Sequence, residues 1–471
     1  MKKYITGIAL ISLVISACSV SKDIKTPVPE APVAFRMADP QTTGDSTSIA
    51  GLQWKQFFTE PVLQSLIDSA IANNYDMQLA LKNVEASQLL LKQTKWNNIP
   101  EANLNIGASS SRPSNNSLNG ISLSQFLGTK HIENYTADVS ISWEADIWGK
   151  IRNQSKAALA SYLQTQEARK LIQTNIVASV SQGYYNLLML DTQLDIANKN
   201  VRLNDSTLNI IKLQYTAGQV SSLGVEQAEA QRLAAAQLIP QLEKNIAIQE
   251  NALRILTGAL PDKIARTAKL EQFNLPEHIA TGVPSEVISR RPDVRSVEFS
   301  LNRANANVGI TKASMYPALR ITADGGVNSF KASNWFNVPA SLFGLVGASV
   351  VQPLLNRKQL STQYNVAQVE REKVVLQFRQ TVLNAVGEVS NSLASIQQLK
   401  LEQAIAARRV TTLQQATTNA NLLFKNGMAN YIEVITAQAN VLQSELELAA
   451  IKRDELSAAS ALYRALGGGW Q

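Results

Sequence analysis

Alternation of apolar and polar residues is the first regular feature of the chain. It is clearest between Tyr135 and Ala145, where the odd-numbered positions up to 143 are apolar and those between them are polar. Segments 103–109 and 319–324 alternate in the same way, whereas Leu342 to Val351 is almost uniformly apolar. These patterns predict four β-strands, three with one apolar and one polar face, and leave the facing of the fourth open.

The other regular pattern is that of very long helices. From Gly149 to about Leu213, apolar residues recur at helical spacing without a proline or another strong breaker. A helix of that length extends roughly 100 Å at 1.5 Å per residue, so it needs partner helices along its length. A returning helix is predicted from about Ser222 to Leu256, and its Pro240 is expected to kink it.

The chain is an internal duplication of a unit of a little over 200 residues. Segment 75–100 matches segment 292–317, with the same spacing between an Asp and a Pro in both copies. The turn at Gly218 matches the turn at Gly427, and a second returning helix is predicted from about Tyr431 to Leu466. Each copy should therefore hold a helix, two strands, a very long helix, a tight glycine turn and a returning helix.

Strands of this kind are typical of a membrane β-barrel with lipid outside and water inside. Aromatic residues near both strand ends resemble interfacial girdles; they are Trp96, Trp143, Trp148 and Tyr316 at the helical end, and Tyr135, Trp335 and Phe336 at the other. Four strands cannot close a barrel, and an open edge in lipid leaves backbone groups unpaired, so closure by three copies and twelve strands is expected. The alternative is a half-buried sheet of a soluble protein.

The N-terminus has the layout of a secretory signal peptide. Lys2 and Lys3 precede an apolar stretch, residues 5–15, that is too short to span a bilayer permanently. The sequence up to Cys18 resembles a bacterial lipobox, in which cleavage leaves an acylated cysteine as the new N-terminus; a chance cysteine is the alternative. Cys18 would then be the lipid anchor, because two or more acyl chains give stable attachment. The Pro-, Ser- and Thr-rich residues that follow, to about 50, suggest an extended tether.

Composition argues against catalysis and against nucleic-acid binding. Charged residues make up 17% of the chain, below the roughly 25% usual for soluble domains, and the net charge of +7 comes without a basic run. Two histidines and one cysteine leave little material for a zinc site or a catalytic dyad. No phosphate-binding or dinucleotide motif is present, so no enzyme, metal or cofactor is predicted.

One segment resembles the central signature of a known family. Val283 to Arg295 reads Val-Pro-Ser-Glu-Val-Ile-Ser-Arg-Arg-Pro-Asp-Val-Arg; related motifs are Ala304 to Ala313, Tyr316-Pro317 and Asp146 to Lys150. Together they resemble the TolC-like outer-membrane factors, in the NodT-type lipoprotein branch of resistance-nodulation-division efflux systems. The Arg290–Arg295 charges themselves are interpreted as a helix cap and inter-helix ion pairs.

The resemblance covers essentially the whole mature chain and implies an α+β membrane protein. Its form would be a trimeric 12-stranded β-barrel continued by a 12-helix periplasmic α-barrel, with two internal repeats per chain. The implied domains are a signal peptide (1–17), a lipidated tether (18–50), repeat 1 (51–260), an equatorial linker (261–284) and repeat 2 (285–471).

The resemblance also implies where the channel is gated. Gly218, Gly427 and the nearby Ala429 would form the periplasmic tip that contacts an adaptor protein. Of two positions that match acidic residues at the family's aperture, Glu433 keeps a carboxylate and Thr436 does not. Three Glu433 side chains on a threefold axis would repel one another and favour cations; the alternative is an ordinary solvated position.

Two departures from the family put its latch in doubt. Relatives use an Arg and a Tyr near this turn as hydrogen-bonding latches, and the matching residues here are Ala429 and Phe424. Neither side chain can make those bonds.

The implied function is a passive exit duct for small molecules in the outer membrane of a Gram-negative bacterium, lipid-anchored and extending into the periplasm. Its partners would be two further copies of the chain, a periplasmic adaptor (membrane fusion) protein, an inner-membrane pump of the resistance-nodulation-division type and outer-membrane lipid, with no nucleic acid. Two alternatives stay open: the exit duct of a type I peptide or protein secretion system, and a lipid-anchored periplasmic coiled-coil scaffold.

Overall fold

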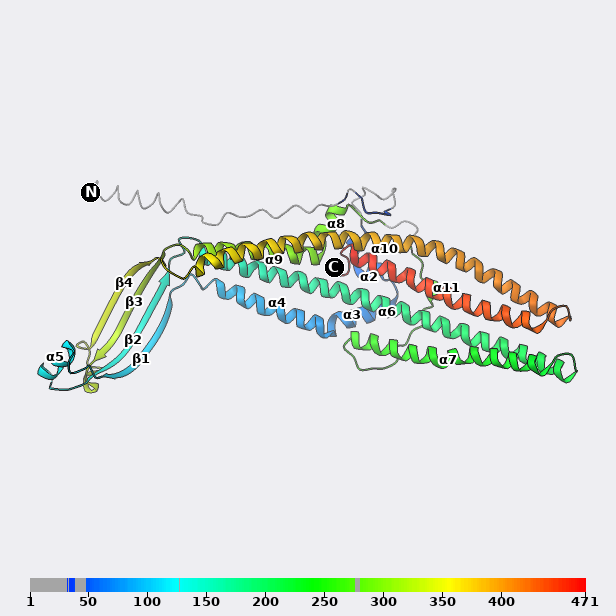
Figure 1. Cartoon of the computed structure of the whole chain (residues 1–471), viewed down its shortest axis with the longest axis horizontal. Coiled ribbons are helices and arrows are strands. Elements are labelled where there is room, and N and C mark those ends of the chain that lie inside the picture. Colours follow the sequence, from blue (N-terminus) through cyan, green and yellow to red (C-terminus); the bar gives the residue numbers. More distant parts are fainter. Residues whose placement is uncertain (1–31, 33, 39–47, 127, 276–279) are drawn as a thin grey trace. The chain divides into compact units, whose positions relative to one another are not determined.

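A computed structural model describes residues 32, 34–38, 48–126, 128–275 and 280–471 (Figure 1). Cys18, the signal peptide and most of the tether lie outside the described residues. The described chain forms two compact units. The sheet unit contains Glu85–Leu163 and Glu298–Leu376, and the hairpin unit contains the described residues of Val28–Val84, Gln164–Val297 and Gln377–Gln471.

The elements follow one another in two matching series. The first is α2 (Trp54–Phe57), α3 (Pro61–Asn73), α4 (Tyr75–Thr94), β1 (Glu101–Ser111), α5 (Leu118–Phe126), β2 (Ile132–Glu144), α6 (Lys150–Thr216) and α7 (Ser222–Leu256). The second is α8 (Pro284–Arg290), α9 (Pro292–Ala313), β3 (Ala318–Ser329), β4 (Leu342–Val351), α10 (Gln359–Lys425) and α11 (Tyr431–Ala465). Helices α6 and α10 have 67 residues each, and α7 and α11 have 35 each. The predicted duplication is therefore confirmed in element order and in element length.

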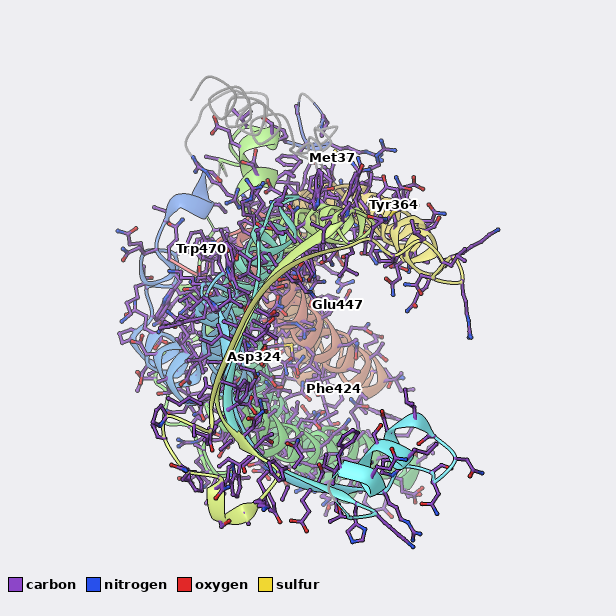
Figure 2. The ribbon with its side chains drawn as sticks, turned by 90° about the vertical axis from the view of Figure 1, so that its left-hand side faces the viewer. Met37, Asp324, Tyr364, Phe424, Glu447 and Trp470 are labelled. Atoms are coloured by element: carbon purple, nitrogen blue, oxygen red, sulfur yellow. The ribbon has the colours of Figure 1, made fainter. Side chains whose placement is uncertain are left out.

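The sheet unit holds one antiparallel sheet in the order β1-β2-β3-β4, and it is curved in the end-on view of Figure 2. Paired residues point to the same face, so the register decides the facing that the sequence left open. Val346 of β4 pairs with Ala323 of β3, and Ala323 in turn pairs with Ile141 of β2. The apolar face therefore continues across β4, whereas Leu345 lies opposite Asp324 on the polar face.

The apolar face of this sheet is uncovered. Leu104 and Ile106 of β1 are 69% and 68% exposed, and Val346 and Val350 of β4 are 80% and 68% exposed. Within the described residues, the outer edges of β1 and β4 also have no partner strand. The sheet therefore needs both an apolar environment and strand partners from outside the chain.

The two predicted aromatic groups form at opposite strand ends. At the helical end, the rings of Trp148 and Tyr316 are 4.9 Å apart, and the Trp148 Nε1–H donates to the carbonyl of Pro317 (2.7 Å). At the loop end, Trp335 lies 5.5 Å from the ring of Tyr135 and 4.9 Å from that of Phe336. Amphipathic rings in such positions are typical of a membrane interface.

The hairpin unit packs two antiparallel helical hairpins, α6–α7 and α10–α11 (Figure 1). Its main core includes the fully buried Tyr184 and Leu187 of α6 and Leu253 of α7. A Cβ on Gly183 would lie 2.8 Å from the Leu253 side chain, so this glycine permits α6 and α7 to approach closely. Helix α7 runs through Pro240 without an interruption, and the expected kink stays a prediction.

The segment between the two copies is tied to the first hairpin by Arg266. Its guanidinium donates to both carboxylate oxygens of Asp191 in α6 (2.5 and 2.6 Å) and to Glu250 in α7. Burial lowers the pKa of Arg266, but the bonds to these two carboxylates outweigh it and raise the pKa overall. Within the described ranges, no helix combines the length and hydropathy that a bilayer crossing requires.

Candidate functional site at the hairpin tips

Both hairpins turn on the same backbone motif. Gly218 and Gly427 have φ angles of +74° and +72°, in the left-handed region that glycine adopts without steric cost. The Gly218 N–H donates to the carbonyl of Tyr215, and that of the next residue donates to Gln214; the bonds at Gly427 are equivalent. These are Schellman caps, which satisfy the last carbonyls of α6 and α10. No atom lies within 4 Å of a Cβ built on either glycine, so the backbone alone requires them.

Gly218 lies in the first turn, and the other residues predicted at the tip and gate lie in or just after the second. Gly427 and Glu433 are exposed and Ala429 is half-buried. Asn430 caps α11, its side-chain oxygen accepting from the N–H of Ile432 (3.0 Å). Glu433 lies in the first turn of α11, where a negative charge stabilises the helix. Its carboxylate has no ion pair among the described residues, which leaves it available to solvent, ions or another chain.

A small apolar cluster holds the two turns together. Its buried members are Leu208, Ile211, Ala228, Phe424 and Val434, and the half-buried Ala429 and Tyr431 pack against it. Phe424 is only 5% exposed, so it serves the packing of the tip. Neither Phe424 nor Ala429 has a side-chain hydrogen-bond donor, so the loss of the family latch stays a prediction.

A different contact joins the hairpins, and it was missed by the sequence analysis. The Tyr431 hydroxyl of α11 donates to Oε1 of Gln227 in α7 (2.9 Å). The Tyr431 ring lies over Gly224, where an added Cβ would be 3.1 Å from it. In the duplicated register Gly224 matches Glu433. A glycine within a helix costs roughly 0.5–1 kcal/mol of stability relative to alanine. The presence of Gly224 in a helix was therefore the one sequence signal that α7 and α11 approach closely.

Further from the turns, buried polar side chains link α11 to α6. Gln438 is fully buried, and its Nε2 donates to Oγ1 of Thr207 (2.8 Å). Asn200 donates to the Gln438 carbonyl (3.5 Å) and accepts from Asn204 (2.6 Å). Such bonds fix how the two helices face each other, because sliding them would leave buried polar groups unpaired.

The charged family signature is structural, as predicted. The Arg291 guanidinium donates to the Asp293 carboxylate (2.7 and 3.0 Å), to Glu388 of α10 (2.9 Å) and to the carbonyl of Ala465 (2.6 Å). Burial lowers the pKa of Arg291, but its two carboxylate partners raise it overall. Among the described residues, no group of three His, Cys, Asp or Glu side chains could hold a metal ion.

Comparison with known proteins agrees with this architecture. A family model described as outer membrane efflux protein matches residues 66–259 and 283–468. The cation efflux system protein CusC of Escherichia coli is 26% identical over 465 residues, 98% of both chains. The toluene efflux pump outer membrane protein TtgC of Pseudomonas putida is 28% identical over 480 residues, 100% of this chain and 96% of TtgC.

The fold is that of known channels. The structure is similar to a crystal structure of CusC from a study of its folding and transmembrane channel formation, with a TM-score of 0.82. The two chains are 25% identical, and the match covers 96% of this chain and 100% of that one. The predicted fold, outer-membrane location and role in efflux are thereby confirmed. The match in both copies, together with the shared fold, establishes that the chain belongs to the outer membrane efflux protein family.

Proposed function

We propose that this protein is the passive exit duct of a tripartite efflux pump and works as a homotrimer. The observation that carries the proposal is the four-stranded sheet with two open edges and an uncovered apolar face. Pairing β1 of one copy with β4 of the next satisfies both edges, and three copies would give a closed barrel of twelve strands. The apolar face would then contact lipid and the polar face would line a water-filled passage.

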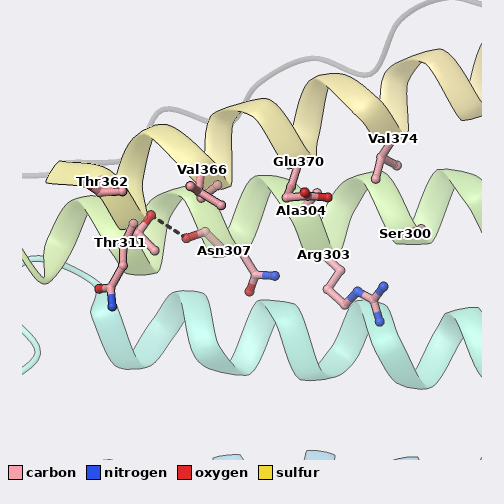
Figure 3. A pocket seen from close by; sticks show the side chains of 11 residues that line it. Ser300, Arg303, Ala304, Asn307, Thr311, Thr362, Val366, Glu370 and Val374 are labelled. Atoms are coloured by element: carbon pink, nitrogen blue, oxygen red, sulfur yellow. Dashed lines mark hydrogen bonds between the residues drawn. The ribbon is translucent and has the colours of Figure 1, made fainter. Parts of the chain in front are cut away.

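A groove beside the sheet supports contact between copies. It has a volume of about 650 Å³ and lies between α9 and α10 in the sheet unit (Figure 3). Its lining includes Ala304 of α9 and Val366 of α10, and Val366 is 52% exposed. Val369 and Leu376 of α10 are 55% and 64% exposed, so this helix also presents apolar surface that a neighbouring copy would cover.

In this assembly the hairpin tips form the periplasmic entrance. Gly218, Gly427 and Ala429 would contact the adaptor, and Glu433 would line the aperture. The link from Tyr431 to Gln227 would hold the two hairpins of one copy together in the closed state. Opening would then require this contact to separate, with the adaptor supplying the necessary binding energy.

The substrate is assigned only as a class, small molecules delivered by an inner-membrane pump of the resistance-nodulation-division type. The names of CusC and TtgC refer to cations and to toluene, and both relatives match nearly the whole chain. This difference supports one duct architecture for chemically different compounds, and we assign selectivity to the pump. Cys18 is proposed as the acylated anchor, on its position after the signal segment.

The decisive experiment is photo-crosslinking at the tip in living cells. A photoreactive residue replaces Met428, which is 69% exposed and adjoins Ala429, and the captured proteins are identified by mass spectrometry. A matched probe at Ile248, 59% exposed on α7 away from the turn, serves as the control. Capture of the adaptor of a proton-driven pump only at Met428 is expected.

Two other outcomes would change the assignment. Capture of an adaptor that belongs to an ATP-driven exporter would move the function to peptide or protein secretion. Failure to capture any adaptor, with the protein trimeric and in the outer membrane, would contradict the assignment of the tip.

A further inference from the structure

The loop end of the sheet carries a one-sided charge. Loops 112–131 and 330–341 contain no Asp or Glu, and their basic residues are Arg112, Lys130, His131 and Lys331. All four are exposed.

Among the described residues, Arg112 and Lys130 have no ion-pair partner, and the Lys331 ammonium lies 5.6 Å from the ring of Phe330. The nearest acid along β2 is Glu133, whose carboxylate accepts from the Tyr135 hydroxyl (2.7 Å).

The helical end of the same sheet is different. There Lys150 pairs with Glu144 (2.9 Å), and Arg320 lies 3.7 Å from the same carboxylate. Arg152 pairs with Asp146 (3.2 Å). Among the described residues, basic side chains at the helical end thus form ion pairs with acids, whereas Arg112, Lys130 and Lys331 do not. The loop end therefore has an excess of positive charge that attracts anions from outside the protein.

The same loops carry large exposed apolar side chains. Leu118 and Phe126 of α5 are 80% and 85% exposed, and Phe330 and Phe336 of the second loop are 53% and 69% exposed. In water such side chains would be unfavourably solvated. Cations beside exposed apolar side chains suit the boundary between acyl chains and lipid headgroups.

The register places two of these cations, Arg112 and His131, on the apolar face of the sheet. Ala108 pairs with Tyr135, and Ser111 pairs with Ile132. Alternation continued one residue past the strand ends brings Arg112 and His131 to the apolar face, beyond Tyr135. Along this face, apolar side chains are followed by the aromatic group at Tyr135, then by Glu133, which accepts from the Tyr135 hydroxyl, and then by the cations. A bilayer leaflet has the same order of hydrocarbon, interface and phosphate.

We propose that the loop end of the sheet binds the phosphate-bearing headgroups of lipids in the outer leaflet of the outer membrane. Arg112, Lys130 and Lys331 supply the charge, and Phe126 and Phe336 enter the acyl boundary. This inference rests on the proposed orientation, in which the loops face outward. It adds recognition of charged lipid headgroups, which the duct function by itself does not require.

The test measures lipid binding to the purified, delipidated full-length protein. Fluorescent lipopolysaccharide and its dephosphorylated form are titrated against the wild type and against the variant Arg112→Gln/Lys130→Gln/Lys331→Gln. A matched variant, Arg408→Gln/Lys244→Gln/Lys269→Gln, removes three exposed cations of the hairpin unit. Native mass spectrometry checks that every sample is the same oligomer.

The loop variant should lose about tenfold or more of its affinity for lipopolysaccharide, because each cation near an anionic surface contributes to binding. The matched variant should bind like the wild type, and the dephosphorylated lipid should bind weakly to all three proteins. Equal binding by the loop variant, or equal binding of the two lipids to the wild type, would overturn the inference. A wild type that fails to form trimers would instead contradict the proposed function.

Discussion

At the scale of single residues, two helical glycines of this protein have opposite roles. Gly224 lies under the Tyr431 ring, and a Cβ there would be 3.1 Å from it. Gly387, in α10, has no atom within 4 Å of the same position. Alanine is intrinsically preferred over glycine in a helix at both positions. A difference between the effects of the two Gly→Ala substitutions therefore measures the contact at the tip.

Gly224→Ala should therefore weaken the closed tip, although alanine favours the helix by about 1 kcal/mol. The expected result is faster entry of a large hydrophilic antibiotic into cells that lack the adaptor, measured as a lower inhibitory concentration. Gly387→Ala is the control and should leave entry unchanged while raising the melting temperature. Equal entry in the two variants would show that the Tyr431 contact does not hold the tip closed.

Tyr463 predicts a pH effect on stability. Burial raises its pKa from 10.0 to about 12, and its hydroxyl donates to the Leu52 carbonyl (2.7 Å). The unfolded chain loses this proton at lower pH than the folded one, so stability is full below pH 10 and falls as pH rises toward 12. Tyr463→Phe should make this alkaline limb less steep in melting curves; burial also raises the pKa of Tyr184 and Tyr185, which keep part of it. Tyr75→Phe, at a tyrosine that is 70% exposed, should leave the limb as steep as in the wild type.

At the scale of elements, the two copies share a backbone design but differ in their side chains. Both long helices end in the same glycine cap, at Gly218 and Gly427. The position after the turn is Gly224 in one copy and Glu433 in the other. Gly224 packs against Tyr431 of the second hairpin, whereas Glu433 is exposed. Duplication has therefore yielded one packing position and one candidate gate position.

Replacing the gate carboxylate should change ion selectivity. In reconstituted channels, Glu433→Gln removes three negative charges from a trimer's aperture, and the preference for cations should fall, as measured by the reversal potential in a salt gradient. Glu402→Gln, at an exposed position of α10, is the matched control. An unchanged reversal potential in Glu433→Gln would assign this residue to the ordinary solvated surface.

At the scale of the whole molecule, the exposed sheet edges make one chain incomplete. Backbone groups on an open edge have no water to bond in a membrane, so the assembly must satisfy them. The proposed β1–β4 pairing between copies can be tested directly, since the one native cysteine, Cys18, lies far along the sequence from both strands.

Ile106→Cys should form disulfides between copies when combined with Gly344→Cys, Val346→Cys or Ala348→Cys, tested one at a time. A pair in register should give a covalently closed trimer on non-reducing gels, because every copy contributes both edges. Ile106→Cys alone should stay monomeric on the same gels. Absence of intermolecular disulfides in all three combinations would exclude the pairing.

Local pattern determined much of this protein. Helix α7 was predicted from about Ser222 to Leu256 and has those bounds, and the turns at Gly218 and Gly427 have the predicted glycine geometry. These features depend on neighbours in the sequence, through helical periodicity and the backbone freedom of glycine. The two repeats were likewise visible because duplication preserves spacing.

Only the tertiary structure decided which side chains meet. The facing of β4 came from its register with β3, since an apolar run has no period of its own. Arg291 reaches Ala465, 174 residues away, and Tyr431 reaches Gln227, 204 residues away. Such contacts depend on how packed helices are rotated and shifted against one another, and the spacing of residues within one helix does not specify either quantity.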